Sequence, residues 1–364
     1  MFSKSKILSV NSDNLACGHY RIIWPNQTVN LKSKEIEVST VNFLPTSLHF
    51  YKSFSKVKAQ RLSSDSELKT LKKIKQISKL KVIYEADDVM FHEDIPNYNV
   101  HKEFYKNVRK NILSMMTNFS DEILTSSKAL CEYYISKTNK KNISVIPNYV
   151  PKFWIDRFFS KKKMLERYLK FKKRPRILFP ASASHFDYLN LNNKSDDFTH
   201  LIKFISKMVD DFEWVFLTTY PKHLEEFVKA GKIKSFAYSD IYEYPYLLDR
   251  IEPNLIVAPL ADNIFNNCKS DIKLKEACSL GIPSIMQDLR PYEKAFFNFR
   301  TGDELIDLIK FVMRDELDYL SHCENARLFA AENWLENKEN IGKHIKCYNK
   351  QDLVPELNNT YEIL

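Results

Sequence analysis

The sequence of 364 residues lacks any run of about 18 apolar residues, the length that a membrane-spanning helix needs. Its first residues, MFSKSKILSVNSDN, hold too short an apolar stretch for a secretory signal. The six cysteines include no C-x-x-C pair, so neither a zinc site nor a disulfide framework is indicated. These absences predict a soluble, cytoplasmic protein whose cysteines are reduced.

The size and the charge of the chain indicate two domains and a basic protein. Hydrophobic residues make up 44% of the chain, which is enough for two α/β domains that each bury a core. The formal net charge is +9, a balance that fits a polyanionic partner such as nucleic acid or an anionic membrane surface. Abundant lysine on solvated helices explains the same charge more simply, and it leaves the partner open.

Strand and helix patterns alternate along the chain, and this order favours parallel sheets with helices on both faces. A basic stretch with helical spacing, residues 158–176, separates two such series. The strands predicted in the first series are 6–11, 79–88, 121–127 and 142–151, and those in the second are 176–182, 212–219, 254–260 and 282–287.

The restart of the pattern predicts two lobes of similar size. We expect a Rossmann-like N-terminal domain over residues 1–150, a linker over 151–174, a Rossmann-like C-terminal domain over 175–320, and a helical segment over 321–364 that packs across the lobes. Open parallel sheets bind ligands beyond the carboxyl ends of their strands, so the expected site is the cleft between the lobes.

A resemblance to a known family is carried by segments spread over most of the chain. They are ACGHYRIIWP, VIYEADDVMF, DEILTSSKAL, VIPNYVP, ILFPASASHFDY and the run over residues 256–293. The last run holds the most specific spacing, K-S-x-I-K-x-x-E-A-x-x-x-G-I-P, over residues 269–283. In these segments the chain resembles the GT-B glycosyltransferases, and within them the family 4-like, retaining group.

The resemblance implies a GT-B fold, with two Rossmann-like parallel-sheet domains facing a central cleft. It also implies a nucleotide-diphosphate sugar, such as a UDP-sugar, held mainly by the C-terminal domain, an acceptor on the N-terminal domain, and no obligatory metal. Two features depart from the family pattern. Cys268 stands where typical members have the first of two glutamates, and ASASHFDYLN stands in place of their Gly-Arg…Lys diphosphate clamp.

Residues 265–283 are predicted to form the centre of the donor site. Ser270 is a good N-cap for the helix that follows it, and a helix start stabilises a diphosphate. Lys269 and Lys273 flank that start and can neutralise the charge that grows on the leaving diphosphate. The resemblance implies that Glu276 accepts the hydroxyls of a ribose. The alternative is an amphipathic helix whose lysines and glutamate are merely solvated.

Acidic residues end a predicted strand in YEADDVMFH, residues 84–92. The resemblance implies that this position faces the sugar and the attacking hydroxyl. Asp87 and Asp88 are candidate catalytic residues, because a carboxylate there can orient the hydroxyl, accept its proton or balance charge at the anomeric carbon. Asp88 and His92 are also candidate acceptor contacts. A D-x-D-like metal site is the rival interpretation, and an acidic N-cap is the structural alternative for one aspartate.

Two loops that follow predicted strands hold further candidate donor contacts. Gly18 permits a close approach of the backbone to phosphate or sugar, and Arg21 can make a bidentate phosphate contact. A bridge from Arg21 to an acidic loop explains that residue equally well. In the second domain, Ser184 and His185 are candidate phosphate contacts in place of the missing clamp, with a structural histidine as the alternative.

Three residues are predicted to contact the acceptor in addition to Asp88 and His92. They are His19, Asn263 and Asn266, and turn formation is the alternative for the two asparagines. The resemblance implies that either Tyr242 or Tyr244 stacks on the nucleotide base. Core packing accounts for these aromatic residues equally well.

The acceptor that we favour from the sequence is hydroxymethylated cytosine in bacteriophage DNA, to which glucose or arabinose is added in the host cytoplasm. The net charge and the basic runs over residues 69–81 and 161–176 favour it, because such an enzyme must hold the DNA backbone and extrude the base. One alternative is a cell-surface or lipid-linked saccharide, with peripheral membrane contact. Another is a non-catalytic DNA-binding protein on the same fold.

Overall fold

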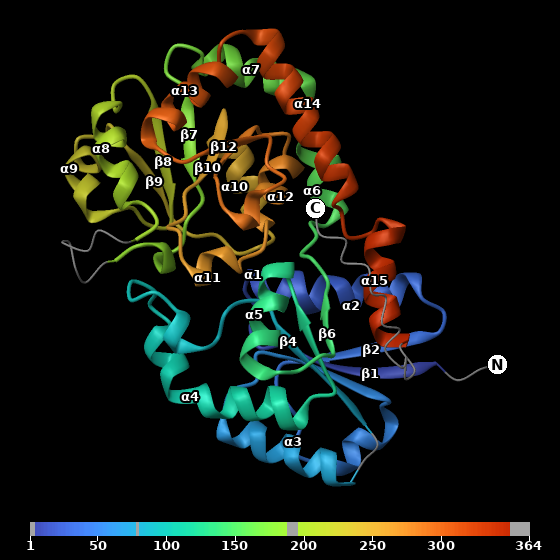
Figure 1. Cartoon of the computed structure of the whole chain (residues 1–364). Coiled ribbons are helices and arrows are strands. Elements are labelled where there is room, and N and C mark those ends of the chain that lie inside the picture. Colours follow the sequence, from blue (N-terminus) through green and yellow to red (C-terminus); the bar gives the residue numbers. More distant parts are fainter. Residues whose placement is uncertain (1–3, 78–79, 188–195, 350–364) are drawn as a thin grey trace, which may run out of the picture.

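The computed structural model describes residues 4–77, 80–187 and 196–349 of the chain. They form two lobes, one above the other in Figure 1, and each lobe is built on a six-stranded parallel sheet surrounded by helices. The expected α/β architecture with two Rossmann-like sheets is confirmed. Within this part of the chain, no helix is both long and apolar enough to cross a membrane.

The N-terminal lobe has the strand order β2-β1-β3-β4-β5-β6. Its strands are β1 (Ser5–Val10), β2 (Ile36–Val41), β3 (Lys56–Gln60), β4 (Lys81–Ala86), β5 (Glu122–Thr125) and β6 (Ile143–Val145). Its helices are α1 (Ala16–Gly18), α2 (Trp24–Lys32), α3 (Asp65–Ile77), α4 (Lys102–Ser114) and α5 (Lys128–Thr138), with 3₁₀ turns at Leu48–Ser53 and His92–Asp94 and π-helical turns at His19–Ile23 and Met115–Phe119.

The sequence analysis predicted four of these strands and missed β2 and β3. Strand β3 reads KVKAQ and is buried along its whole length, lysines included. Because its polar residues are buried with its apolar ones, neither alternation nor a continuous apolar run marks it in the sequence.

The C-terminal lobe has the strand order β12-β11-β10-β7-β8-β9. Its strands are β7 (Arg176–Phe179), β8 (Glu213–Leu217), β9 (Lys234–Phe236), β10 (Leu255–Ala258), β11 (Ser284–Gln287) and β12 (Phe297–Phe299). From the linker onward the helices are α6 (Lys152–Phe158), α7 (Lys161–Phe171), α8 (Thr199–Lys207), α9 (Glu225–Lys229), α10 (Tyr244–Ile251), α11 (Ile264–Asn267), α12 (Ile272–Ser279), α13 (Gly302–Val312), α14 (Glu316–Glu332) and α15 (Lys338–Asn349), with 3₁₀ turns at Ala183–His185, Lys222–Leu224 and Arg290–Tyr292. The analysis missed β9 and β12, which are three-residue edge strands.

The strand orders place one topological switch point in each lobe. In the N-terminal sheet the order reverses between β1 and β3, and in the C-terminal sheet it reverses between β7 and β10. Loops diverge from the sheet at such a point and leave a crevice beyond the carboxyl ends of the strands. The segments that follow these strands therefore supply the polar residues of the cleft.

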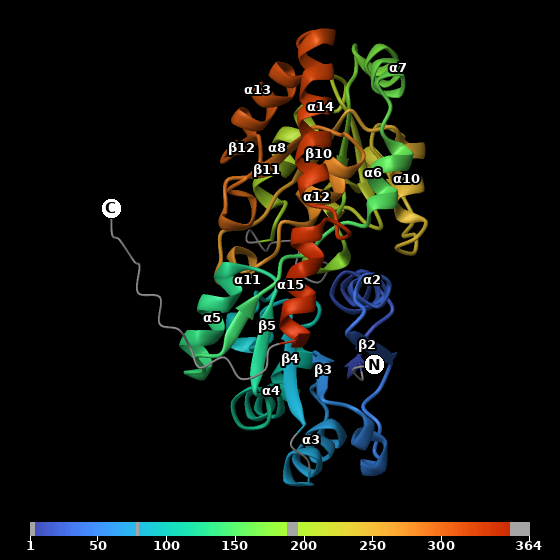
Figure 2. The same ribbon diagram turned by 90° about the vertical axis from the view of Figure 1, so that its right-hand side faces the viewer.

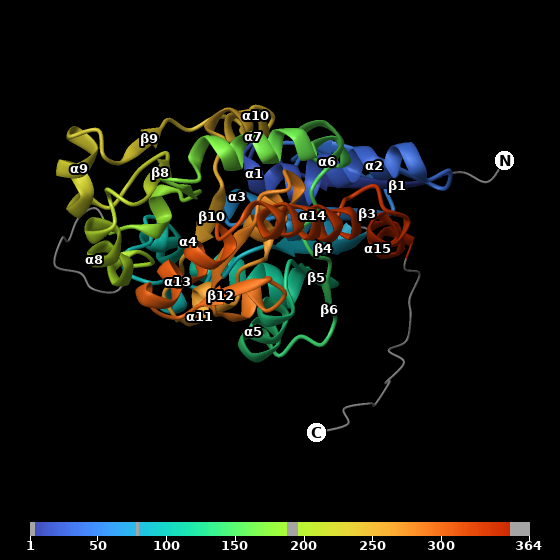
Figure 3. The same cartoon turned by 90° about the horizontal axis from the view of Figure 1, so that it is seen from above.

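The last two helices run from one lobe to the other. Figure 2 shows α14 along the upper lobe and α15 continuing downward beside the lower lobe. The Tyr348 hydroxyl on α15 donates to Asn26 Oδ1 at 2.6 Å, and Lys56 Nζ donates to the Cys347 carbonyl at 3.2 Å. Seen from above, α15 lies at the opposite end of the molecule from β9 (Figure 3). The cleft is therefore tied along one side by the end of the described chain.

A buried charge cluster fixes the interior of the N-terminal lobe. Glu85, at the end of β4, accepts a 2.8 Å hydrogen bond from Arg21 Nε, and its other oxygen lies 3.2 Å from Lys58 Nζ. The side chains of all three residues are at most 1% exposed. Arg21 lies in the π-helical turn of a continuous helix, Ala16–Lys32. One carboxylate thus holds two cations from separate segments out of water.

Replacing Glu85 with alanine is expected to lower the free energy of unfolding by about 3–5 kcal/mol, because two buried cations lose their shared counter-charge. Urea unfolding followed by circular dichroism measures the change. Glu324→Ala, which breaks the more exposed Arg327 pair on α14, is the matched control and is expected to cost less than about 1 kcal/mol. Equal losses in the two variants contradict this prediction.

Candidate active site

A cavity of about 350 Å³ lies in the cleft and is lined by both lobes. The N-terminal lobe contributes segments that follow β1, β3 and β4, and the C-terminal lobe contributes segments that follow β7 and β10. The predicted site residues that line this cavity together are Asp87, Asp88, Ser184, His185, Lys269, Ser270, Lys273 and Glu276. Three separate sequence signals therefore converge on one space.

Helix α12 supplies the donor-side residues, but it begins one residue later than predicted. The N-cap is Asp271, not Ser270. The Ser270 hydroxyl instead accepts a 2.9 Å hydrogen bond from Asn148 Nδ2 of the other lobe. Past the end of the helix, Gly281 has a φ of +63°, and its N–H donates to the Cys278 carbonyl at 2.9 Å. Glycine fits that left-handed position without strain.

Glu276 is buried at the boundary between the lobes. The Tyr20 hydroxyl, from the N-terminal lobe, donates to Glu276 Oε1 at 2.8 Å. Burial raises the pKa of Glu276 to about 7, against the opposing effects of hydrogen bonds from Tyr20 and Tyr244 and of the charge of Lys273. The carboxylate is therefore held in place by hydroxyl donors and ionises close to neutral pH.

Lys273 belongs to a hydrogen-bonded chain with His185 and Asp197. His185 Nδ1 lies 2.6 Å from Asp197 Oδ2, and Lys273 Nζ lies 3.1 Å from His185 Nε2. Burial and the nearby ammonium of Lys273 lower the pKa of His185 to about 4, so the ring is neutral. With its proton on Nδ1 toward Asp197, the ring presents the Nε2 lone pair to the lysine. Burial and the neighbouring Lys269 lower the pKa of Lys273 to about 8.

Asp197 also connects the two lobes. Its second oxygen accepts hydrogen bonds from the Tyr98 hydroxyl at 2.8 Å, from Asn266 Nδ2 at 2.7 Å and from the Ala261 N–H at 2.8 Å. Tyr98 comes from the N-terminal lobe and the other donors come from the C-terminal lobe. The orientation of His185 thus depends on contacts that cross the cleft.

The two neighbouring aspartates after β4 differ in their surroundings. Asp87 is paired with Arg61, whose charge outweighs the effect of burial and lowers the pKa of the Asp87 carboxyl. Burial raises the pKa of Asp88, against the opposing charges of Lys269 and Arg61. Asp87 is therefore a fixed negative charge, and Asp88 is the better proton acceptor of the two.

Gly18, His19 and Arg21 lie outside the lining of this cavity, contrary to the direct contacts predicted for them. A Cβ atom on Gly18 would come within 1.8 Å of the Asp13 carbonyl oxygen, so the glycine allows the preceding loop, not a ligand, to approach. His19 Nδ1 lies 2.8 Å from the Leu15 carbonyl. The Arg21 guanidinium points into the lobe interior, in agreement with the bridging alternative.

The predicted acceptor contacts His92, Asn263 and Asn266 do not line the cavity either. His92 Nδ1 faces Glu93 at 3.1 Å in a 3₁₀ turn. Asn263 is the N-cap of α11, where its Oδ1 accepts from the Asn266 N–H at 2.9 Å, as the turn alternative predicts. The buried Asn266 amide is occupied by Asp197 and by the Ala261 carbonyl. Both asparagine amides also lie within hydrogen-bond distance of the Tyr98 hydroxyl of the N-terminal lobe, at 3.3 Å and 3.0 Å, so they contribute to the contact between the lobes.

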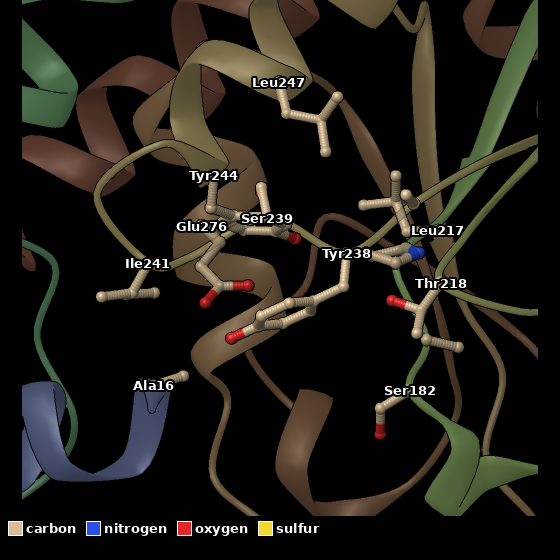
Figure 4. Close-up of a pocket in the computed structure, with 13 residues that line it drawn as sticks. Ala16, Ser182, Leu217, Thr218, Tyr238, Ser239, Ile241, Tyr244, Leu247 and Glu276 are labelled. Atoms are coloured by element: carbon tan, nitrogen blue, oxygen red, sulfur yellow. The ribbon is translucent and has the colours of Figure 1, made fainter. Parts of the chain in front are cut away.

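An apolar pocket of about 140 Å³ adjoins the cavity on the side of the C-terminal lobe. Figure 4 shows Tyr238 and Glu276 pointing into it, with Ala16 of the N-terminal lobe at its edge. Tyr244 lines this pocket, whereas Tyr242 packs edge-on against His19. The residues shared by the pocket and the cavity are Ala16, Ser182 and Glu276.

Several residues of the site were missed by the sequence analysis. Arg61 follows β3, a strand that the analysis did not predict, and Tyr20 was not singled out. Tyr98 and Asp197 lie in irregular segments with no motif around them. The loop over 237–241, which contains Tyr238, follows β9, a strand that the analysis also missed.

Cys268, at the position of the missing glutamate, is buried in an apolar cluster with residues of the N-terminal lobe. Its thiol lies 3.7 Å from the Ala129 carbonyl, and burial raises the pKa of Cys268 to about 12. The residue therefore serves the contact between the lobes. Among the described residues, no group of three or more His, Cys, Asp or Glu side chains is placed to hold a metal ion.

Comparisons of the sequence with protein-family models and with curated proteins find no match. Solved structures do match the fold. HepE of Anabaena, in complex with UDP and glucose, gives a TM-score of 0.63 at 12% identity and covers 95% of this chain and 100% of its own. The N-terminal domain of Candida albicans trehalose-6-phosphate phosphatase gives 0.60 at 11% identity, covering 95% and 97%. MnaA of S. aureus, bound to UDP, gives 0.50 at 11% identity, covering 94% and 96%. The chain therefore has the GT-B fold.

Replacing Glu276 with glutamine is expected to change the pH dependence of stability. The folded protein holds the pKa of this carboxyl near 7, above its ordinary value of 4.5, so stability is lost as pH rises through that interval. The loss amounts to about 3 kcal/mol, and Glu276→Gln escapes it. Urea unfolding between pH 4 and pH 8 measures the difference. Glu166→Gln, on the exposed side of α7, is the control. A stability difference that does not vary with pH contradicts the prediction.

Proposed function

We propose that the protein is a glycosyltransferase that uses a nucleotide-diphosphate sugar, with a UDP-sugar as the favoured donor. The observation that carries this proposal is the position of Glu276. Its carboxylate stands where a base-sized apolar pocket meets a polar cavity that contains two lysines. A nucleotide sugar has matching parts in the same order: a base for the apolar pocket, ribose hydroxyls for Glu276 and a charged diphosphate for the lysines.

In this proposal each part of the donor contacts the group that suits it. The base occupies the apolar pocket beside Tyr238, and the ribose hydroxyls donate to Glu276. The diphosphate lies at the start of α12, where the helix dipole and the charges of Lys269 and Lys273 stabilise it. The Ser182 and Ser184 hydroxyls, 2.7 Å apart at the edge of the cavity, can contact the phosphates that the family clamp otherwise holds. The UDP in the HepE and MnaA structures supports uridine as the nucleoside.

The transfer breaks the bond between the anomeric carbon and the diphosphate oxygen and forms a bond from that carbon to the acceptor oxygen. Lys273, held by His185, stabilises the negative charge on the departing UDP. Asp88 accepts the proton of the acceptor hydroxyl, and the Asp87–Arg61 pair fixes the strand end beside it. Retention of anomeric configuration is proposed from the family resemblance alone, and NMR of the product tests it.

The acceptor that we propose is hydroxymethylated cytosine in phage DNA, and the sugar is glucose or arabinose. Its support is the net charge of +9 and a cavity with room for an extruded base. The basic runs lend less support than expected. Helix α3 is at the lower end of the molecule and α7 is at the upper end (Figure 1), so neither run borders the cleft. Lys75 and Lys163 are also paired, with Asp121 and Asp249.

Glu276→Ala is expected to raise the KM for the donor about 10- to 100-fold, because a charged hydrogen-bond acceptor of the ribose is lost. Lys273→Ala is expected to lower kcat as well, by about 10²- to 10³-fold, because its charge acts on the leaving group. Steady-state kinetics with a UDP-sugar measures both changes, and Lys163→Ala on α7 is the control. Unchanged constants in both site variants place the donor elsewhere.

The acceptor is identified by offering labelled UDP-glucose or UDP-arabinose with hydroxymethylcytosine DNA, plain DNA and a lipid-linked saccharide. We expect the label to move to hydroxymethylcytosine DNA only. Transfer to the saccharide alone refutes the DNA acceptor and leaves the glycosyltransferase proposal standing. If several donors show no turnover while the protein still binds DNA at low salt, the protein is a binding module and both enzyme proposals are wrong.

A further inference from the structure

A second cavity, of about 490 Å³, lies next to the 350 Å³ cavity of the candidate active site, which we call the reaction cavity. It opens between the start of α5 in the N-terminal lobe, the segment before α12, and the 3₁₀ turn Arg290–Tyr292 with the residues after it. Lys269 and Ser270 line both cavities, so the two spaces adjoin at these residues. We call this space the basic cavity.

The charge of the basic cavity is unbalanced. Its lining includes five cationic residues, Lys128, Lys269, Arg290, Lys294 and Lys343, and two acidic ones, Asp271 and Glu293. The Asp271 carboxylate is already paired with the buried Lys275 at 2.9 Å. Arg290 and Lys343 are paired with glutamates outside the lining, Glu132 at 2.7 Å and Glu339 at 3.3 Å. Lys128 and Lys294 form no ion pair within the described part of the chain. An anion that enters this space therefore meets cations that the protein does not itself neutralise.

Two further features favour an anion. Helix α5 points its N-terminus at the cavity, and Ser127 caps it by accepting a hydrogen bond from the Leu130 N–H at 3.0 Å. The positive end of the helix dipole thus adds to the lysine charges. In addition, the pKa of the buried Lys275 is lowered. Burial is the main cause, Asp271 opposes it, and the nearby charges of Lys294 and Lys343 add to the lowering. Like charges gathered at this density are relieved by a bound polyanion.

We propose that the basic cavity binds backbone phosphates of a DNA acceptor next to the nucleotide that receives the sugar. The inference rests on the proposed DNA acceptor and adds the place where the strand runs. With the target base in the reaction cavity, the strand passes Lys269 and Ser270 and reaches Lys128 and Lys294 within the adjoining space. Phosphate contacts of this kind set the position of a strand without reading its sequence.

A lipid-linked saccharide fits the basic cavity less well. The apolar residues in its lining are short or cyclic, namely Ala129, Val145, Pro147 and Pro291. These four are the apolar residues of the lining, whereas five lining residues are cationic, so a series of phosphates finds more partners there than an acyl chain does. The observations therefore favour a nucleic-acid strand over a lipid diphosphate.

The test compares two double variants that each remove two lysines. Lys128→Ala with Lys294→Ala removes charge from the basic cavity, and Lys69→Ala with Lys73→Ala removes the same charge from α3, in a basic run at the far end of the lobe. The measurements are the Kd of a hydroxymethylcytosine oligonucleotide by fluorescence anisotropy between 50 and 200 mM salt, and the KM of that oligonucleotide in the transfer assay. UDP binding by calorimetry verifies that each variant is folded.

For the basic-cavity variant we expect the Kd and the KM for DNA to rise about tenfold or more, and the slope of log Kd against log salt to fall by about 1 to 2. The α3 variant is expected to stay within about twofold of the parent. If the parent protein transfers sugar to DNA but the basic-cavity variant binds DNA as the parent does, or if only the α3 variant is impaired, the inference is wrong and the proposed function stands. Transfer to a saccharide alone overturns both.

Discussion

Two buried carboxylates, those of Glu276 and Asp197, set the constraint on which the cleft depends. A carboxylate removed from water must be met by hydrogen-bond donors or positive charge. For each of them, one donor is a tyrosine hydroxyl from the opposite lobe, Tyr20 or Tyr98. Asp197 in turn orients His185 toward Lys273. The same hydrogen bonds therefore hold the two lobes together and fix the positions of the polar groups between them.

The sequence predicted those parts of the site whose signals are local. The acids after β4 and the Ser184–His185 turn after β7 come soon after apolar strands, and the segment from Lys269 to Glu276 follows β10 and the short helix α11. Parallel sheets bring the carboxyl ends of such strands to one edge. The partners that complete the site had no such signal. Arg61 follows a strand whose lysines are buried, and Asp197 acts from an irregular segment. For Arg21 the bridging alternative describes the structure better than the phosphate contact, because its guanidinium pairs with Glu85 inside the lobe.

The distribution of charge matters more than its total. A net charge of +9 suggested a basic surface, yet the two lysine-rich helices lie at opposite ends of the molecule. At physiological salt, exposed charges act over about 8 Å, so neither helix influences the cleft appreciably. The cations beside the cleft come instead from helix starts and turns of both lobes, where the sequence shows them singly. Runs of like charge are easier to see in a sequence, but here they are the less informative feature.

The π-helical turn at His19–Ile23 gives the first helix an extra residue within an otherwise regular path. Within it, the adjacent residues Tyr20 and Arg21 serve different neighbours, one across the cleft and one in the interior of their own lobe. Each residue of an α-helix turns the chain by about 100°, so deleting one position here would rotate one of these side chains away from its partner. The segment is thus more sensitive to a change of length than to most changes of composition, and any related chain that keeps both contacts has to preserve its spacing.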